Sequence, residues 1–196
     1  MPLIIPKEHL VPYKIVAIDP GSNFLGLSVL EIDPNCSILS IVSQTLNVES
    51  LVESAFENRD IQSNRVNKQL KIETELYRIF TYYKPLLVIC ESPFYNRLRP
   101  GAFAPLVEVL SAIQRTVINY NQLVPFTTVE PSVIKKSIGA GHICGKEEVK
   151  AALMATPEIL NALTTNLNYL DEHAIDSIAV GYTYVLQQRR LLMKER

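Results

Sequence analysis

Two segments of this chain combine an unbroken apolar run with an acidic residue at the end of the run. They are residues 15–19, which end on Asp19, and residues 86–91, which end on Glu91. Short apolar runs rich in Ile and Val are typical of strands that are covered on both faces of a sheet. A carboxylate at the end of such a strand loses part of its water, which costs free energy unless a counter-charge lies nearby. The two segments therefore predict a sheet with acidic side chains at one edge and a positive partner for them.

A third acidic cluster opens a helix that we expect over residues 172–188. Asp171 is suited to cap this helix, and Glu172 is favoured in its first turn by the helix dipole. His173 and Asp176 are three residues apart, so they project from the same side of that turn. A divalent cation is the simplest counter-charge for these acids. Cations held by carboxylates indicate phosphodiester chemistry.

Each of these features also has a purely structural explanation. Asp19 could open a turn, because Asp is favoured at the first position of a turn. Glu91 could be a surface residue, and His173 and Asp176 could form a polar helix face. The four residues taken together, in this order along the chain, favour a shared metal site over four independent coincidences.

Turn signals and hydrophobic periodicity divide the chain into three strands followed by alternating helices and strands. The expected strands are residues 13–19, 25–32, 38–46, 86–91 and 125–129, and the expected helices are 61–83, 103–120, one that begins at Pro131, 146–154 and 172–188. This order predicts an α/β fold with a mixed five-stranded sheet, whose first three strands form an antiparallel meander and which helices flank. If the first and fourth strands are parallel neighbours, Asp19 and Glu91 meet at the carboxyl ends, where open α/β sheets bind ligands.

Two of the expected helices carry apolar stripes. In the helix over residues 61–83 the stripe is Leu70, Leu76, Ile79 and Phe80, and in the helix over residues 103–120 it is Leu106, Val109, Leu110, Ile113 and Val117. Such a stripe is ordinarily the face that packs on the core.

The length of 196 residues suits one domain, which we expect over residues 13–190, with an N-terminal extension, 1–12, and a C-terminal tail, 191–196. Lys and Arg together number 19 and Asp and Glu 20, so nucleic acid would have to bind through local basic patches. Three widely spaced Cys favour a reducing compartment over a disulfide framework or a zinc site. The sequence begins without a signal-peptide pattern, and no apolar run approaches the roughly 20 residues of a spanning helix. We expect a soluble intracellular protein that does not contact a membrane, whether in cytoplasm, nucleoid or organelle.

The acidic segments, taken in order and spacing, resemble those of the RuvC Holliday-junction resolvases, which belong to the ribonuclease H-like superfamily. The resemblance covers about residues 13–188 and also includes a lysine, a glycine-rich loop and a second lysine. The matching stretches are Ile18-Asp19-Pro20-Gly21-Ser22, Cys90-Glu91-Ser92-Pro93-Phe94, Ile134-Lys135-Lys136-Ser137-Ile138-Gly139-Ala140-Gly141 with Gly145-Lys146-Glu147-Glu148-Val149, and His173-Ala174-Ile175-Asp176. A viral or organellar member of the family is compatible with this pattern.

The resemblance implies a ribonuclease H-like nuclease domain and a crossover junction endodeoxyribonuclease active in DNA recombination and repair. It implies a homodimer that binds four-way DNA junctions, with each subunit nicking one of two opposing strands by means of divalent metal. It also adds a second reading of the stripe on the helix over residues 103–120, because this helix could pair with its copy across a dimer axis.

Hydrolysis by this chemistry uses two Mg²⁺ ions, one that activates water and one that bears the leaving oxygen. We expect Asp19 to bridge both ions, Glu91 to hold one and Asp176 to hold the other. His173 could ligate metal, for which Mn²⁺ would suit it better than Mg²⁺, or could act as a proton shuttle. Lys135 and Lys146 flank the glycine-rich loop, and one of them could reach the scissile phosphate, where its charge would stabilise the transition state. The resemblance favours Lys146 for this role.

The expected DNA contacts lie in the loops and helices beside these acids. Phe94 and Tyr95 could stack on an unpaired base, or could simply pack beneath their loop. Basic residues expected to contact phosphate are Arg97, Arg99, Lys135, Lys136, Lys146 and Lys150, with Arg65, Lys68 and Lys71 as further candidates. Each of them alone could equally be a solvated surface residue.

Other functions remain possible at this point. A related nuclease could prefer flaps, replication forks or RNA–DNA hybrids over four-way junctions. A phosphate-binding ATPase of the actin–sugar kinase type also begins with a strand, an Asp-x-Gly turn and a second strand, but it needs a second lobe. A junction-binding protein without catalysis is a further alternative, which the intact acids disfavour.

Overall fold

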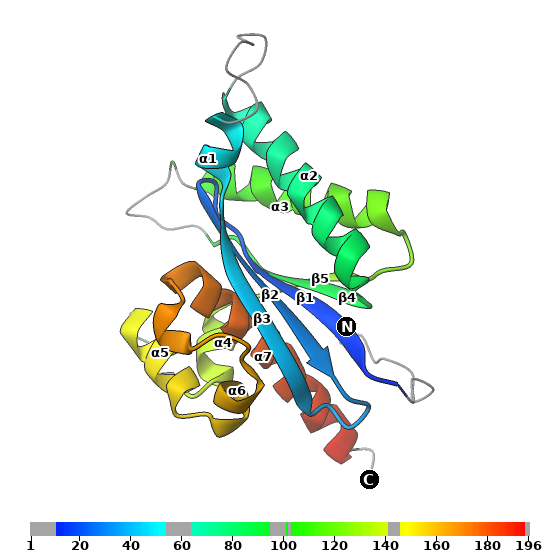
Figure 1. Cartoon of the computed structure of the whole chain (residues 1–196), viewed down its shortest axis with the longest axis vertical. Helices are drawn as coiled ribbons and strands as arrows, with labels where there is room; N and C mark the ends of the chain where they lie inside the picture. Colours follow the sequence, from blue (N-terminus) through cyan, green and yellow to red (C-terminus); the bar gives the residue numbers. More distant parts are fainter. Residues whose placement is uncertain (1–10, 54–63, 95–100, 102, 141–145, 195–196) are drawn as a thin grey trace.

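β1 (Tyr13–Asp19) is the middle strand of a five-stranded sheet with the order β3-β2-β1-β4-β5 (Figure 1). β2 (Phe24–Ile32) and β3 (Ile38–Asn47) extend the sheet on one side by antiparallel pairing, whereas β4 (Leu87–Glu91) and β5 (Phe126–Val129) extend it on the other by parallel pairing. The computed structural model describes residues 11–53, 64–94, 101, 103–140 and 146–194. The predicted mixed sheet with its antiparallel meander is confirmed.

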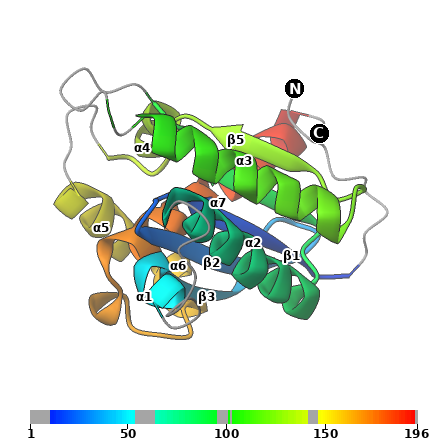
Figure 2. The same ribbon diagram turned by 90° about the horizontal axis from the view of Figure 1, so that it is seen from above.

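Helices cover both faces of this sheet, as Figure 2 shows from above. α2 and α3 lie on one face, and α4 to α7 lie on the other (Figure 1). The helical elements are α1 (Val48–Glu53), α2 (Asn64–Tyr83), α3 (Phe103–Tyr120), α4 (Pro131–Ser137), α5 (Lys146–Met154), α6 (Pro157–Ala162), the 3-10 turn η2 (Leu167–Tyr169) and α7 (Glu172–Lys194). Within the described residues, no helix has the length and apolar character that crossing a membrane requires.

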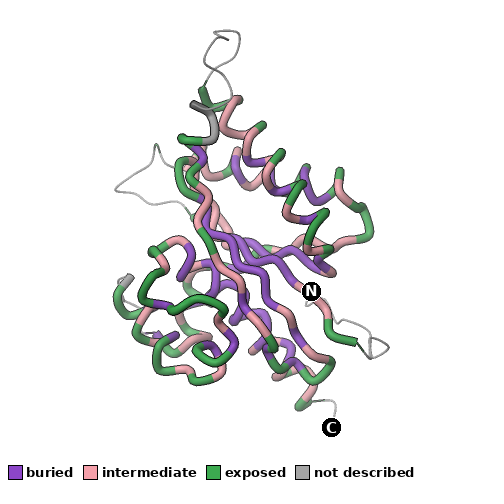
Figure 3. Tube along the Cα trace, viewed as in Figure 1, coloured by how far each residue is buried: buried purple, intermediate pink, exposed green. Residues whose placement is uncertain are grey.

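The strands alternate their side chains between two halves of the core. Ile15 and Ala17 of β1 pack in the half that contains α7, whereas Val16 and Ile18 pack in the half that contains α2 and α3. Figure 3 shows β1 and its neighbours as largely buried strands. Asp19 continues the series of Ile15 and Ala17, so its side chain is directed to the α7 face of the sheet.

The predicted strands and helices agree with the structure to within one residue at their described ends, except at three short helical segments and at one helix end. Residues 61–63 of the first expected helix lie outside the described residues. α1, α6 and η2 were not predicted, because none of them is long enough for apolar positions to recur over several helical turns. α7 continues to Lys194 rather than ending at Gln188, so that residues 191–194, expected in a tail, belong to this helix. Its last turns are anchored by Arg189, whose guanidinium donates hydrogen bonds to the Glu158 carboxylate and to the Cys36 carbonyl.

One predicted core position on α2 is wrong. The buried residues of this helix are Ile72, Leu76 and Phe80, which follow one another at intervals of four. Leu70 is 43% exposed, because it lies on the opposite side of the helix from that series. Ile79 is partly buried against the same core, as predicted.

Replacing leucine by alanine at these two positions should therefore have very different effects. Leu76→Ala removes a side chain that is 0% exposed, so it should lower the free energy of unfolding by about 2 to 5 kcal/mol. Leu70→Ala is the same chemical change on the same helix and should cost less than about 1 kcal/mol. Urea unfolding of both variants measures the difference, and equal losses would contradict the assigned register of α2.

Candidate active site

Asp19 and Glu91 end neighbouring parallel strands at the same edge of the sheet. Ile18 pairs with Cys90 across β1 and β4, so the acids that follow these two residues lie side by side. Glu91 follows Ile89 by two positions, and Ile89 packs in the α7 half of the core. Both carboxylates are therefore directed to the face that α7 covers.

The register of the antiparallel strands places one residue of β2 and one of β3 in line with Asp19, and these three residues form a cross-sheet row. Asp19 pairs with Gly26 of β2, and Gly26 pairs with Thr45 of β3. A β-carbon at Gly26 would lie 1.9 Å from the carbonyl oxygen of His173, so only glycine allows the backbone of α7 to lie here. The first turn of α7 thus rests directly on the sheet, beside Asp19.

Asp171 caps α7, as predicted. Its Oδ1 accepts a hydrogen bond from the backbone N–H of Ala174 at 3.0 Å, which satisfies one of the amides that a helix start leaves unpaired. The same oxygen accepts the hydroxyl hydrogen of Thr45. The cap is therefore linked to β3 as well as to its own helix.

His173 lies between two carboxylates and under an aromatic ring. Its Nδ1 is 3.0 Å from Asp19 Oδ2, and its Nε2 is 3.7 Å from Glu172 Oε1. The ring of Phe24 stacks on the imidazole, with 5.7 Å between centroids and 16° between planes. The hydrogen bond with Asp19 raises the pKa of His173, and burial opposes that rise. Since an ionised carboxylate only accepts, Nδ1 carries the proton in this pair and leaves Nε2 as the atom open to other chemistry.

Glu91 is a largely buried carboxylate with two further acids nearby. Its pKa is raised from 4.5 to about 8, chiefly by burial and in addition by the charges of Asp19 and Asp176, whereas Lys135 lowers it. Carboxylates that share a partly buried region in this way are typical of sites that bind a cation or hold a proton.

The chemistry of these donors fits a divalent cation of the Mg²⁺ type. Asp19, Glu91 and Asp176 offer hard oxygen ligands. Burial and the two neighbouring acids raise the pKa of Glu91, and a bound cation would offset both causes. As the side chains lie, no group of three or more His, Cys, Asp or Glu within the described residues is arranged to hold a metal ion. A cation would have to draw these carboxylates toward a common point. The predicted assignment of two Mg²⁺ ions therefore stays a prediction.

The structure describes the side chains of four of the eight predicted DNA-contacting residues. Lys135, in the last turn of α4, is close enough to Glu91 to lower its pKa. Lys136 is exposed in the same turn, and Phe94 follows β4 and is 54% exposed. Lys150 is half-buried on α5. Lys146 begins α5, but its side chain lies outside the described part of the chain, as do Tyr95, Arg97 and Arg99.

The further basic candidates on α2 have protein partners. Arg65 binds the Glu108 carboxylate of α3 through two nitrogens, at 3.0 and 2.5 Å. Lys68 donates to Asn23 Oδ1 at 2.6 Å and lies 3.5 Å from Glu49, so it braces the turn between β1 and β2. Lys71 also lies on α2. Arg65 and Lys68 would have to exchange these partners in order to contact phosphate.

Sequence reasoning missed three residues of this region. Gly26 could have been found, because a lone glycine within a strand indicates a close backbone approach. Phe24 carried no signal, since an apolar residue at the start of a strand is ordinarily core. Thr45 carried none either, because its contact with Asp171 depends on the register of β3.

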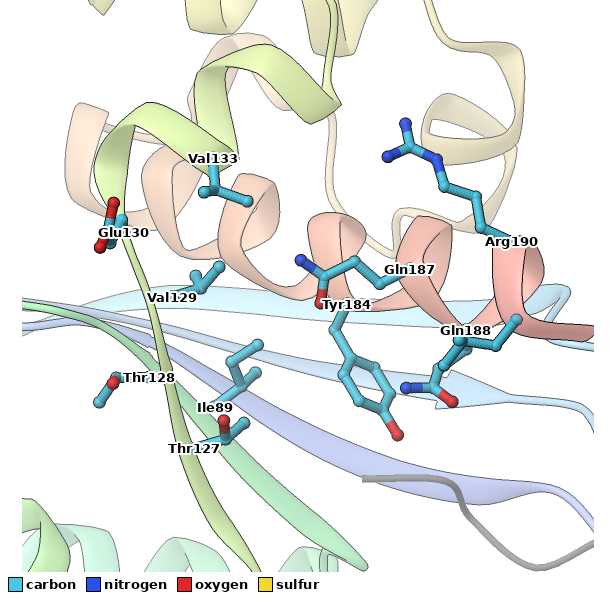
Figure 4. Close-up of a pocket in the computed structure, with 11 residues that line it drawn as sticks. Ile89, Thr127, Thr128, Val129, Glu130, Val133, Tyr184, Gln187, Gln188 and Arg190 are labelled. Carbon is cyan, nitrogen blue, oxygen red and sulfur yellow. The ribbon is translucent and has the colours of Figure 1, made fainter. Parts of the chain in front are cut away.

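A pocket of about 530 Å³ lies elsewhere, between β4, β5, α4 and α7 (Figure 4). Its floor includes Ile89 and Thr127, and its wall on α7 includes Tyr184 and Gln187. None of the four predicted metal-binding residues lines it. The pocket is thus separate from the group of acids at the sheet edge.

Solved structures with this fold include proteins that act on Holliday junctions. The Thermus thermophilus RuvC structure aligns with a TM-score of 0.67 and 17% identity over 90% of this chain and 96% of that chain. T. thermophilus RuvC in complex with Holliday junction substrate aligns with a TM-score of 0.65 at the same identity and coverage. The yeast mitochondrial Holliday junction resolvase Ydc2 aligns with a TM-score of 0.63 and 14% identity over 99% of this chain and 89% of that chain. The ribonuclease H-like fold that the sequence resemblance implied is therefore confirmed.

Comparison by sequence adds nothing to this, since no family model and no curated protein matches the chain.

Metal-free protein should lose stability as the pH rises from about 5 to about 8. The folded state keeps a proton on Glu91 up to a pKa of about 8, whereas the unfolded chain releases it near 4.5. The raised pKa of His173 acts in the same direction. The stability from these protons is complete below the unfolded pKa and is lost as the pH passes through the folded pKa. Glu91→Gln should remove a loss on the order of 3 to 5 kcal/mol.

Urea unfolding in EDTA at pH 5 to 8.5 measures this dependence. Glu130→Gln, at an exposed carboxylate just beyond β5, is the matched control and should keep the wild-type slope. A wild-type stability that does not change over this pH range would contradict the crowding of negative charge around Glu91.

Proposed function

We propose that this protein is a structure-selective endonuclease that resolves four-way DNA junctions by paired, symmetrical nicks. The observation that carries the proposal is the meeting of Asp19 and Glu91 with His173 at the carboxyl edge of the sheet. The shared fold with RuvC, including RuvC bound to a Holliday junction, supports the choice of DNA substrate. An enzyme of this kind would be a crossover junction endodeoxyribonuclease acting in recombination and repair.

The acids are proposed as ligands for a pair of Mg²⁺ ions, with Asp19 between them, Glu91 on one side and Asp176 on the other. Bound ions would supply an activated water and a counter-charge for the leaving oxygen. Mn²⁺ should substitute, because His173 adds a nitrogen donor. Since Asp19 occupies Nδ1 of His173, its Nε2 is the atom that would either ligate metal or exchange a proton with the attacking water.

The remaining residues are proposed to hold the DNA. Lys135 lies near Glu91, and Lys146 follows the glycine-rich loop, so both are assigned to the scissile phosphate. Lys136 and Lys150 are assigned to flanking phosphates. Phe94, whose ring is more than half exposed beside the acids, is assigned to stacking on a base at the crossover. Tyr95, Arg97 and Arg99 keep the DNA-contacting roles expected from the sequence.

Two copies of the chain are proposed to act together, because paired nicks require two catalytic sites on one junction. The outer face of α3 has Val107 and Ile118 exposed, and their spacing of eleven residues places them on one side of the helix. The buried stripe of α3 packs inward, with Val109, Ile113 and Val117 in the core. The two faces of α3 could therefore serve the core and a dimer contact at once.

Asp19→Asn should abolish cleavage of a four-way junction, by at least about 100-fold, while leaving junction binding intact or stronger. The asparagine keeps the shape of the side chain but removes the charge. Asp33→Asn, just beyond the opposite end of β2, is the matched control. The Oδ1 of Asp33 accepts hydrogen bonds from the backbone N–H groups of Asn35 and Ser37, and the side-chain oxygen of asparagine can accept them too. Cleavage is measured in Mg²⁺ on labelled junctions, and binding is measured in Ca²⁺ or EDTA. Retained cleavage by Asp19→Asn would refute the assigned chemistry.

The choice of substrate is tested with matched four-way, three-way, flap and linear DNA in Mg²⁺. Symmetrical paired nicks confined to the four-way substrate support a resolvase. Preferential cutting of flaps or forks would instead identify a related nuclease for branched DNA. Equal cutting of linear duplex would overturn selectivity for structure.

Ile118→Glu should weaken the proposed dimer, because it places a charge in an apolar contact. Analytical ultracentrifugation should then show monomers where wild type forms dimers, and paired nicks should give way to single nicks. Asn119→Glu adds the same charge at an exposed position about 100° around the helix from Ile118, away from this contact, and is the control. A wild-type protein that is monomeric with and without junction would contradict the dimer.

A further inference from the structure

A hydroxyl group two strands away from Asp19 contacts the start of α7. Thr45 of β3 belongs to the same cross-sheet row as Asp19, with Gly26 between them. The missing side chain of Gly26 leaves room for the backbone of α7, whose His173 carbonyl lies where a β-carbon would be. Across this space the Thr45 hydroxyl donates to Asp171 Oδ1.

The backbone of Ala174 is held through both its N–H and its carbonyl group. Its N–H donates to the same Oδ1 of Asp171, and its carbonyl accepts hydrogen bonds from Ser43 at 3.0 Å and from Ser177 at 2.8 Å. His173 is the residue directly before Ala174. The direction of its side chain therefore depends on contacts that Asp171 and the serines make.

A line of buried hydroxyls continues from here into the core. Ser28 of β2 donates to Ser43 at 2.8 Å and lies 2.6 Å from the hydroxyl of Ser177. Ser28 and Ser177 are both fully buried. Buried hydroxyls cost free energy unless they are paired, so these three serines favour one placement of α7 on the β2–β3 hairpin. Thr45 and Asp171 extend the same pattern to the exposed edge.

We infer that Thr45 is a positioning residue of the catalytic centre, which acts through the Asp171 cap to hold His173 against Asp19 and Phe24. Thr45 itself contacts neither of the acids that end β1 and β4. Asp171 is exposed, so without the Thr45 hydroxyl its carboxylate can turn to water, and the first turn of α7 loses a fixed point. Where the inference concerns turnover, it rests on the proposed nuclease function.

Thr45→Val tests the inference, because valine has the shape of threonine without the hydroxyl. Thr45→Ser, which retains a hydroxyl, is the rescue variant. Thr164→Val is the matched control, since the Thr164 hydroxyl also bonds to β3, at the Ile41 carbonyl and away from the acids. All three are made in the full chain and compared with wild type.

The first readout requires neither metal nor DNA. Stacking on Phe24 displaces the NMR signals of the His173 ring protons, which a His173→Gln variant identifies. In Thr45→Val these signals should move toward the values of an unstacked imidazole, and hydrogen exchange of the Ala174 amide should accelerate at least about tenfold. Thr45→Ser and Thr164→Val should both match wild type. Unchanged ring signals and amide exchange in Thr45→Val would overturn the inference.

The second readout is steady-state cleavage of a four-way junction. Thr45→Val should lower kcat by about 10- to 100-fold with KM within about twofold of wild type, because misplaced catalytic groups slow the chemical step. Thr45→Ser should restore kcat. A normal kcat for Thr45→Val, or an equal loss for Thr164→Val, would also overturn the inference. If wild type cleaves no branched DNA, the proposed function fails, and the ring signals and amide exchange still decide the role of Thr45.

Discussion

The contact between the backbone of α7 and Gly26 is the constraint on which the candidate site depends. Because no side chain stands at Gly26, the first turn of α7 rests on the sheet itself rather than on a layer of side chains above it. That closeness brings His173 within hydrogen-bonding distance of Asp19. It also lets β3, two strands away, reach the helix cap at Asp171. A longer separation would leave the acids of the strands and those of the helix in different environments.

Some polar groups near this contact have hydrogen-bond partners, whereas one carboxylate is poorly stabilised. The hydroxyls of Ser28 and Ser177 are buried and paired, so they stabilise the position of α7. Glu91 is largely buried beside Asp19 and Asp176, and among the described residues Lys135 offsets part of their charge, so its carboxylate is poorly stabilised. Local instability of this kind, beside a well-satisfied scaffold, is typical of functional sites. The paired serines fix the position of α7 on the sheet, and a positively charged ligand could bind the carboxylate of Glu91.

The mixed sheet with its antiparallel meander and the strand bounds to within one residue could be predicted, because apolar runs and turn residues carry those signals locally. The Asp171 cap could be predicted for the same reason. The stack of Phe24 on His173 and the bond from Thr45 could not, since both depend on the register of separate strands. The parallel pairing that joins Asp19 to Glu91 entered only as a condition, because it joins segments far apart in the sequence. Leu70 was misplaced because several apolar residues on α2 fit more than one helix face, and packing against the sheet decides between them.

Insertions and deletions should be tolerated unequally around this sheet. The turn over residues 20–23 is tight, with a β-carbon at Gly21 excluded by the Phe24 carbonyl oxygen, so its length is fixed by direct contact. Adding or removing one residue there would shift β2 by one position against β1 and reverse the face of every side chain in it. The position opposite Asp19 would then hold a bulky residue. The connection over residues 121–125, where Leu123 is exposed, joins α3 to the edge strand β5, so a change in its length would leave the pairing of β1 with β2 untouched.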